Sequence, residues 1–309
     1  MSLRIAVPDL VSPSYFPAIA AVELGLFKSE GLDATLELVF PVTRAYQELR
    51  AGRLDLVAGA AHAPLYVFQD WSGARLLCAL AQHMYWFLVL RSDLGVTRGD
   101  LRAVRGLRIG AAPGPVDGLR RMLREVDIDP ERDVKIGPVP AAAGAGVSFG
   151  VAAANALAAG EIDGFWANGM GAEIAVKSGT GTLVIDARRG DGPPGVRHYT
   201  FPALIATEQT IASAPNLLEA AVRAIISAQR ALTEGPERAT AVGKKLFPPA
   251  EAELIGELIQ RDVPYYDAAI SVETITALNR FAGDMGILSS HVPYERVVAT
   301  QFKHLWERQ

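Results

Sequence analysis

The strongest constraint on the fold is an alternation of strand-like and helix-like segments through the first two thirds of the chain. Short apolar runs rich in β-branched residues, such as 54–58, are separated by stretches with helical periodicity. This order is typical of a parallel sheet covered by helices, so we predict an α/β fold with open, doubly wound sheets. The first group comprises expected strands at 4–8, 34–40, 54–58, 76–81 and 86–91, and expected helices at 14–30, 42–51 and 64–71.

The same pattern then starts again, which predicts a second lobe. After its last strand comes a loop rich in Gly, Pro and Arg, at 187–197, which we expect on the surface. A late strand at 199–206 is followed only by helical sequence with proline breaks. The second group comprises expected strands at 107–111, 134–138, 164–167 and 182–186, and expected helices at 116–126, 150–159 and up to 176.

A late strand of this kind is explained if the chain leaves the first lobe near Arg91 and returns near Tyr199. We therefore predict lobe 1 at 1–90 plus 199–309, with lobe 2 inserted at 91–198. Two crossings form a hinge. Open α/β sheets bind ligands at the carboxyl ends of their strands, so we expect the ligand in a cleft between the lobes.

Composition limits the possible partners. The chain has 309 residues and a formal net charge of −4, which does not fit the basic surface that binds nucleic acid. No uninterrupted apolar run reaches the ~20 residues that span a bilayer. Cys78 is the single cysteine and lies in an apolar run, which favours a buried thiol. No secretory leader is visible, so the protein is either cytosolic or trimmed of its leader, and we expect that a leader has been trimmed.

Several blocks of sequence resemble one family of ABC transporter substrate-binding proteins, those serving nitrate, sulfonates, taurine and thiamine-precursor pyrimidines. The most specific block is a small-residue helix followed by a Gly-bulky-Phe turn and "EGLD", at 18–33. Each block keeps its relative place along nearly the whole chain. The blocks read AIAAVELGLFKSEGLD (18–33), ELRAGRLDLVAGAAHAP (48–64), VRGLRIGAAPGPVDGLRRML (104–123), ALAAGEIDGFWAN (156–168), AVKSGTGTLVIDAR (175–188) and APNLLEAAVRAIISAQRAL (214–232).

The resemblance implies a type II periplasmic-binding-protein fold and a role outside the cytoplasm. Such a protein, expected as a monomer, closes about its hinge on a small organic ligand and delivers it to an ABC permease in the inner membrane. We expect no catalytic residue, cofactor or metal. The alternative is an enzyme on the same fold acting on a small aromatic or heterocyclic metabolite. Enzymes with this fold include yeast-type pyrimidine synthases, sulfinate desulfinases and the small enzymes of an alternative menaquinone route. The first two need cysteines in roles that Cys78 does not fit.

The first candidate ligand contacts lie in the loop after the opening strand, at Ser12, Ser14 and Tyr15. This loop leads into a helix, and the free N–H groups at a helix N-terminus suit a carboxylate or sulfonate. The alternative is that Ser12 or Ser14 only caps the helix. A second loop is expected directly after the strand 54–58, and its candidate contacts are Gly59, Ala60 and His62. The small residues allow close approach of a ligand, and the imidazole can donate or accept a hydrogen bond. A lone loop histidine can equally be a solvated or capping residue.

The second lobe contributes a loop at Gly114, Pro115, Val116 and Asp117, where the glycine allows close backbone approach to a ligand. The resemblance implies hydroxyl donors here. Their replacement by Pro115, Val116 and Asp117 weakens the case for nitrate, sulfate or a simple sulfonate. Asp117 can also simply complement the helix dipole.

Aromatic residues complete the candidate set. Trp166 and Asn168 lie on one face of a strand end, with Met170 beyond them and Trp86 near the first crossing. Packing in the core or at the hinge is the alternative for both tryptophans. A pocket of this kind favours an aromatic or partly apolar acid, a sulfonate or a pyrimidine-like ligand.

Overall fold

The computed structural model describes residues 2–140, 142 and 148–306, and within them two compact α/β units. The first unit comprises residues 1–10, 15–82 and 200–309, and the second comprises 11–14 and 83–199. Each unit contains a five-stranded mixed sheet. This confirms the predicted α/β class. The helical expectation for 307–309 lies outside the described residues.

The first sheet has the order β2-β1-β3-β10-β4. β1 is parallel to β2 and β3, whereas β10 is antiparallel to β3 and β4. Every residue of the central strand β3 is buried, as its continuous apolar sequence requires. The strands are β1 (Ser2–Val7), β2 (Asp33–Leu38), β3 (Leu56–Ala60), β4 (Ala74–Ala79) and β10 (Pro202–Thr207).

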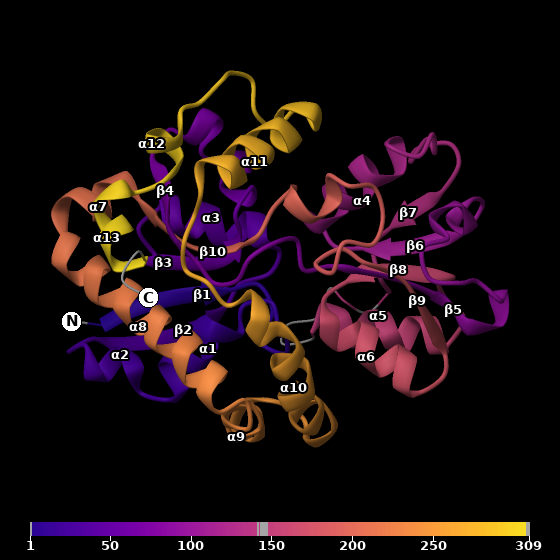
Figure 1. Cartoon of the computed structure of the whole chain (residues 1–309), viewed down its shortest axis with the longest axis horizontal. Helices are drawn as coiled ribbons and strands as arrows, with labels where there is room; N and C mark the ends of the chain where they lie inside the picture. Colours follow the sequence, from indigo (N-terminus) through magenta and orange to yellow (C-terminus); the bar gives the residue numbers. More distant parts are fainter. Residues whose placement is uncertain (1, 141, 143–147, 307–309) are drawn as a thin grey trace. The chain divides into compact units, whose positions relative to one another are not determined.

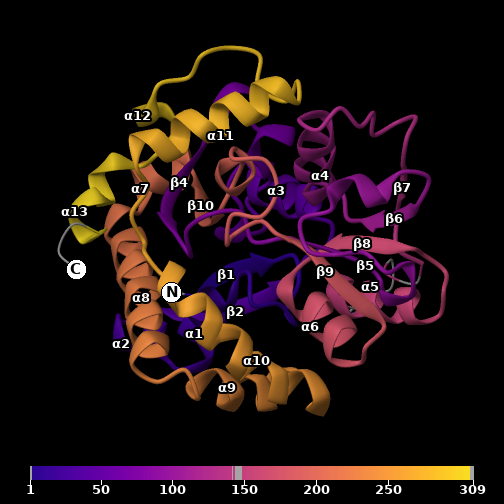
Figure 2. The same ribbon diagram turned by 45° about the vertical axis from the view of Figure 1, so that its right-hand side comes forward.

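Helices cover the first sheet, and the long α8 packs against α1 and α2 (Figures 1 and 2). α9 and α10 form a further helix pair. The helices are α1 (Phe16–Glu23), α2 (Leu26–Ser29), α3 (Val42–Arg50), α7 (Glu208–Ser213), α8 (Pro215–Glu234), α9 (Arg238–Leu246), α10 (Pro249–Asp262), α11 (Val272–Asp284), α12 (Tyr294–Val297) and α13 (Lys303–Trp306). Within the described residues, no helix has both the length and the apolar character needed to cross a membrane.

The second sheet has the order β7-β6-β8-β5-β9. α4 contacts β8, whereas α5 and α6 lie side by side and contact β8 and β9; Figure 1 shows the pair on the opposite side of the sheet from α4. The elements are β5 (Phe87–Arg91), β6 (Arg108–Ala111), α4 (Pro115–Arg124), β7 (Lys135–Gly137), α5 (Phe149–Ala158), β8 (Gly164–Ala167), α6 (Gly169–Lys177) and β9 (Gly181–Asp186).

Three local features differ from the sequence prediction. β5 was expected before the first crossing, but it pairs with β8 and β9 in the second sheet. The expected helix 14–30 is interrupted at Gly25, whose φ of 74° ends α1 and starts α2. The expected helix 64–71 is instead two 3₁₀ turns, Ala63–Tyr66 and Gln69–Trp71, and Asp70 is left-handed with φ 49°.

Candidate functional site

The second unit brings several chain segments to one edge of its sheet. β6 and β8 are parallel, so their carboxyl ends lie at this edge. β5 runs antiparallel to β8 and β9, and its first residue, Phe87, pairs with Ala167 and Asp186 at the ends of those strands. The segment before β5 therefore emerges at the same edge as the segments after β6, β8 and β9. Strand-end loops of this kind bind ligands in open α/β sheets.

Gly114 shapes the loop between β6 and α4. Its φ of 89° and ψ of −69° disfavour any residue with a side chain, and no side chain caps the helix that follows. Pro115 occupies the first helical turn, as predicted, and Val116 is half-buried. Asp117 is buried, and this burial raises the pKa of its carboxyl to about 6 against the opposing effect of Arg120 and Arg124. The loop thus presents backbone and a carboxyl group of raised pKa.

Two tryptophans from the predicted set come together beside this loop. The ring centroids of Trp86 and Trp166 are 6.2 Å apart, and both side chains are buried. Trp166 Nε1 donates to the Pro115 carbonyl at 3.0 Å. A Cβ added to Gly118 would lie 3.4 Å from the Trp86 ring. The two tryptophans therefore fix the start of α4, which supports the packing role given as the alternative in the sequence analysis. A ligand contact by either tryptophan stays a prediction.

Asn168 and Met170 lie at the start of α6. Asn168 is the N-cap of this helix, and its Oδ1 accepts from the backbone N–H groups of Met170 (3.0 Å) and Gly171 (3.3 Å). The amide oxygen therefore satisfies donors that a helix end leaves free. The Met170 side chain is fully buried. The capping role has direct support, and the predicted ligand contacts of these two residues remain predictions.

The loop 11–14 groups with the second unit, although it precedes α1. Ser12 is fully buried, and its Oγ accepts from the Ser14 backbone N–H at 3.1 Å, so this hydroxyl stabilises the turn. Ser14 Oγ is buried and has no hydrogen-bond partner within the part of the chain that the structure describes. A buried hydroxyl without a partner is costly, which favours Ser14 as a ligand contact. Tyr15, also buried, precedes the first residue of α1.

In the first unit, Gly59 and Ala60 are the last two residues of the central strand β3 rather than part of the loop after it, and only His62 follows the strand. A Cβ on Gly59 would lie 2.8 Å from Tyr46 Oη, so packing alone requires a small residue at this position. The buried Ala60 uses its carbonyl to accept from the same hydroxyl at 3.4 Å. His62 is fully buried, with Nδ1 3.0 Å from Thr200 Oγ1 and its ring 5.4 Å from that of Phe281. His62 is thus a packed histidine rather than a solvated one.

The sequence analysis missed a cluster of basic side chains at the edge of the second sheet. We call His83, Arg188, Arg197 and His198 the cationic cluster. Arg188 follows β9 in the loop expected at the surface, yet it is 2% exposed and its guanidinium lies 5.8 Å from the Tyr85 ring centroid. His83 Nε2 lies 2.6 Å from Arg197 Nη2, and its ring centroid is 5.2 Å from that of His198. The position of Arg188 just after a strand was the available signal.

The cluster makes stability depend on pH. Burial, followed by the charges of Arg197, His198 and Arg188, lowers the pKa of His83 from 6.5 to about 4. The unfolded chain therefore binds a proton between about pH 6.5 and pH 4 that the folded protein does not, so acidification through this window lowers the free energy of unfolding. Urea unfolding at a series of pH values measures this effect. On acidification from about pH 6.5 to pH 4, His83→Asn is expected to lose less free energy of unfolding than the wild type.

The wild type must be compared with His83→Asn because Asp117 changes the free energy of unfolding with pH in the opposite direction to His83. Its raised pKa makes the folded protein hold a proton that the unfolded chain loses, so its contribution is present at low pH and disappears as the pH rises through about 6. This contribution is common to the wild type and His83→Asn. Identical pH dependence in the two proteins would show that His83 is not responsible.

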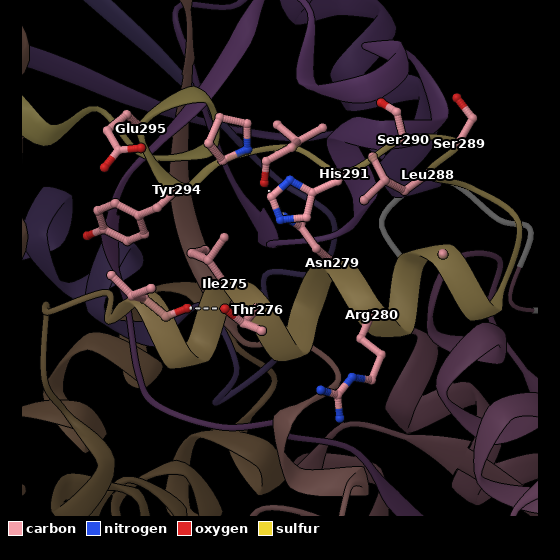
Figure 3. Close-up of a pocket in the computed structure, with 14 residues that line it drawn as sticks. Ile275, Thr276, Asn279, Arg280, Leu288, Ser289, Ser290, His291, Tyr294 and Glu295 are labelled. Atoms are coloured by element: carbon pink, nitrogen blue, oxygen red, sulfur yellow. Dashed lines mark hydrogen bonds between the residues drawn. The ribbon is translucent and has the colours of Figure 1, made fainter.

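A hollow of about 680 Å³ in the first unit contains none of the predicted residues. It lies along α11 and the segment 288–295 (Figure 3). Asn279 in its wall already accepts from Trp71 Nε1 and donates to the Val292 carbonyl, and Thr276 donates to the Val272 carbonyl. These polar groups hold the structure together, so the hollow does not compete with the strand-end residues as the candidate site.

The structure also bears on covalent and metal chemistry. Cys78 is fully buried in β4, and burial raises the pKa of its thiol. A buried thiol of this kind is a poor nucleophile, which confirms the predicted buried thiol. Over the residues that the structure describes, no group of three or more His, Cys, Asp or Glu side chains could hold a metal ion.

Comparisons with solved structures show likeness along nearly the whole chain. A protein from Bordetella bronchiseptica RB50 is 19% identical, with a TM-score of 0.80 over 99% of this chain and 97% of that chain. The alkanesulfonate-binding protein SsuA from Xanthomonas axonopodis pv. citri, bound to MOPS, is 14% identical, with a TM-score of 0.72 over 97% of each chain. A DSZB variant in complex with biphenyl-2-sulfinic acid is 15% identical, with a TM-score of 0.69 over 99% of each chain.

These likenesses show the fold, which is the type II periplasmic-binding-protein fold that the sequence resemblance implied. No curated protein matches the chain at a significant level. A family model described as "NMT1/THI5 like" matches residues 12–239, well over half of the sequence. The chain therefore belongs to the NMT1/THI5-like family.

Proposed function

We propose that this chain is the solute-binding component of an ABC importer and that its ligand is a small organic molecule. The predicted ligand classes are an aromatic or partly apolar acid, a sulfonate or a pyrimidine-like compound. We also propose that the protein closes on its ligand by bending at the two connecting segments near 82–83 and 199–200. We infer a location outside the cytoplasm, a permease in the inner membrane as partner, and a monomeric protein.

The observation that carries the proposal is the convergence of strand-end segments at one edge of the second sheet. This edge combines the Gly114 loop, which has no side-chain cap, with the basic side chains after β9. Family membership and the full-length likeness to SsuA, an alkanesulfonate-binding protein, support binding of a small molecule at such an edge. A structure of the ligand-binding component of an ABC-type import system from Staphylococcus aureus has the same fold, with a TM-score of 0.72.

A second candidate function is an enzyme on the same scaffold. The likeness to DSZB, a desulfurization enzyme, favours it. The buried Cys78, with its raised thiol pKa, argues against a cysteine nucleophile in this chain. The two functions differ in whether the bound compound is returned unchanged.

The proposal predicts a ligand-dependent thermal shift. Wild-type protein is to be melted with a panel of aromatic carboxylates, sulfonates, ureas and pyrimidines. A ligand at a hundredfold excess over its Kd stabilises the folded protein by about 2.7 kcal/mol, because only the folded state binds it. For a chain of 309 residues such a gain raises the melting temperature by about 4 °C.

Recovery of the bound compound decides between the two functions. Mass spectrometry after prolonged incubation is expected to return the compound unaltered and in full. Accumulation of a product would contradict the importer role and support the enzyme. Absence of any shift across the whole panel would contradict the predicted ligand classes. Transport itself can be tested with a strain from which the gene has been deleted. Its growth is measured with the identified compound as the sole source of sulfur or carbon.

A further inference from the structure

The cationic cluster has the geometry of a built site rather than of scattered surface charges. It runs from the buried Arg188 through the half-buried Arg197 and His83 to the exposed His198. The backbone fixes the two segments to each other, because Met84 N–H donates to the Arg197 carbonyl at 2.9 Å. His83 itself has a φ of 66°, an uncommon conformation for a residue with a side chain. Conformations of this kind concentrate at functional sites.

Three carboxylates of the second unit that lie near the cluster bond to other groups. Asp186 accepts from Arg189 at 2.6 Å, and Asp191 accepts from Arg98 at 2.8 Å. On α4, Glu125 accepts from the Tyr199 hydroxyl at 2.6 Å and pairs with Arg121 at 2.9 Å. Three of the charges that lower the pKa of His83 belong to basic residues, Arg197, His198 and Arg188. Arg197 itself lies within ion-pair distance of no carboxylate among the described residues, so its positive charge is available at the ligand-bearing edge.

Arg197 offers a hydrogen-bond donor to a ligand. Its Nη2 donates to His83 Nε2, because a guanidinium cannot accept, and the imidazole is thus neutral with its proton on Nδ1. Arg197 Nε is buried and has no hydrogen-bond partner among the described residues. A buried guanidinium N–H without an acceptor is costly, and an oxyanion would satisfy it with a charge-assisted hydrogen bond.

We propose that the cationic cluster binds the oxyanionic group of an organic ligand, such as a sulfonate or a carboxylate, through Arg188 and Arg197. This deepens the proposed function, on which it rests, by naming an acidic ligand rather than a neutral pyrimidine. An anion placed here also stabilises the protonated forms of His198 and of His83, whose protonation on Nε2 breaks its hydrogen bond with Arg197 and frees that guanidinium N–H for the anion. Binding is then accompanied by proton uptake, and affinity rises as the pH is lowered from 7 towards 5.

The test is calorimetric titration of the full chain at pH 7 with benzenesulfonate, benzoate, inorganic sulfate and the neutral analogue benzenesulfonamide. The wild type is expected to bind at least one of the two organic anions at least tenfold more tightly than the sulfonamide. Arg197→Gln is expected to lose at least tenfold in affinity for that anion and to leave the sulfonamide unaffected. Arg98→Gln is the matched control, because Arg98 belongs to the same unit but pairs with Asp191.

Sulfate separates an organic ligand from a free inorganic ion. Tighter binding of sulfate than of both organic anions would overturn the assignment of an organic ligand. Arg188→Met removes a buried group and can fail to fold, so each variant is first melted without ligand. The independent measurement is the titration of His83 and His198 by NMR of the wild type. Saturation with the bound anion is expected to raise both pKa values, and unchanged values would overturn the proposal.

The remaining outcomes separate this inference from the proposed function. Equal anion binding by the wild type and Arg197→Gln, or a wild type that prefers the sulfonamide, would overturn the anion site and leave the importer role standing. Conversion of the bound anion to a product would overturn the importer role and leave the anion site standing. Failure of all three anions to bind would overturn the anion site alone.

Discussion

Replacing Gly114 with valine is expected to lower ligand affinity at least tenfold, or about 1.4 kcal/mol of binding free energy, while both units remain folded. Gly114 has a φ of 89°, which a β-branched residue cannot adopt without strain of about 1–3 kcal/mol. The backbone relaxes by moving the start of α4, and the new side chain blocks close approach of a ligand. Calorimetry with the ligand identified in the thermal panel measures the loss.

The matched control is Gly106→Val. Gly106 has a similar φ of 78° and precedes β6 at its opposite end, with no atom within 4 Å of an added Cβ. This variant therefore carries the same backbone strain away from the ligand-bearing edge. It is expected to lose stability and to keep its affinity. Equal affinity losses in the two variants would mean that strain alone weakens binding, and unchanged affinity in Gly114→Val would remove the loop from the site.

The layered architecture could be predicted because local sequence determines it. Buried strands of mixed α/β sheets are continuous apolar runs, as in 56–60 and 164–167, and both runs are fully buried strands in the structure. Helix boundaries followed equally local signals, such as Pro115 at the start of α4. Residue type and spacing along the chain were enough for these elements.

The partners of β5 could not be predicted in this way. The sequence of 86–91 identifies a strand, but its neighbours β8 and β9 lie far along the chain. Pairing depends on which sheet edge is open, and propensity does not contain that information. The buried position of Arg188 was hidden for a similar reason. Its loop has a surface composition, and only the fold places the side chain against Tyr85.

The candidate site shows a further limit, which concerns small and polar residues. Gly59 was expected to make room for a ligand, and the structure shows a second reason for a small residue there, because an added Cβ would lie 2.8 Å from Tyr46 Oη. Asn168 was expected to contact a ligand, and the structure shows that it caps α6, while the ligand contact stays a prediction. A sequence indicates that a position must be small or polar, but only the coordinates identify the neighbour responsible.

The second large effect concerns stability, at the contact between α5 and α6. Gly171→Ala is expected to destabilise the protein by about 2–3 kcal/mol. The added Cβ would lie 2.4 Å from the Gly150 carbonyl oxygen and 2.9 Å from its Cα, so the two helix backbones must separate. Separation also disturbs the cap, because Asn168 Oδ1 accepts from Gly171 N–H. Urea unfolding of each variant measures the change.

Helix propensity alone predicts the opposite sign, so the experiment separates propensity from packing. Alanine is more favourable than glycine within a helix by about 1 kcal/mol. Gly283→Ala in α11 supplies this reference, because no atom lies within 4 Å of its added Cβ, and we expect it to stabilise the protein slightly. A stabilised Gly171→Ala would show that α5 and α6 can move apart freely, in which case Gly150 and Gly171 do not fix the position of the Asn168 cap.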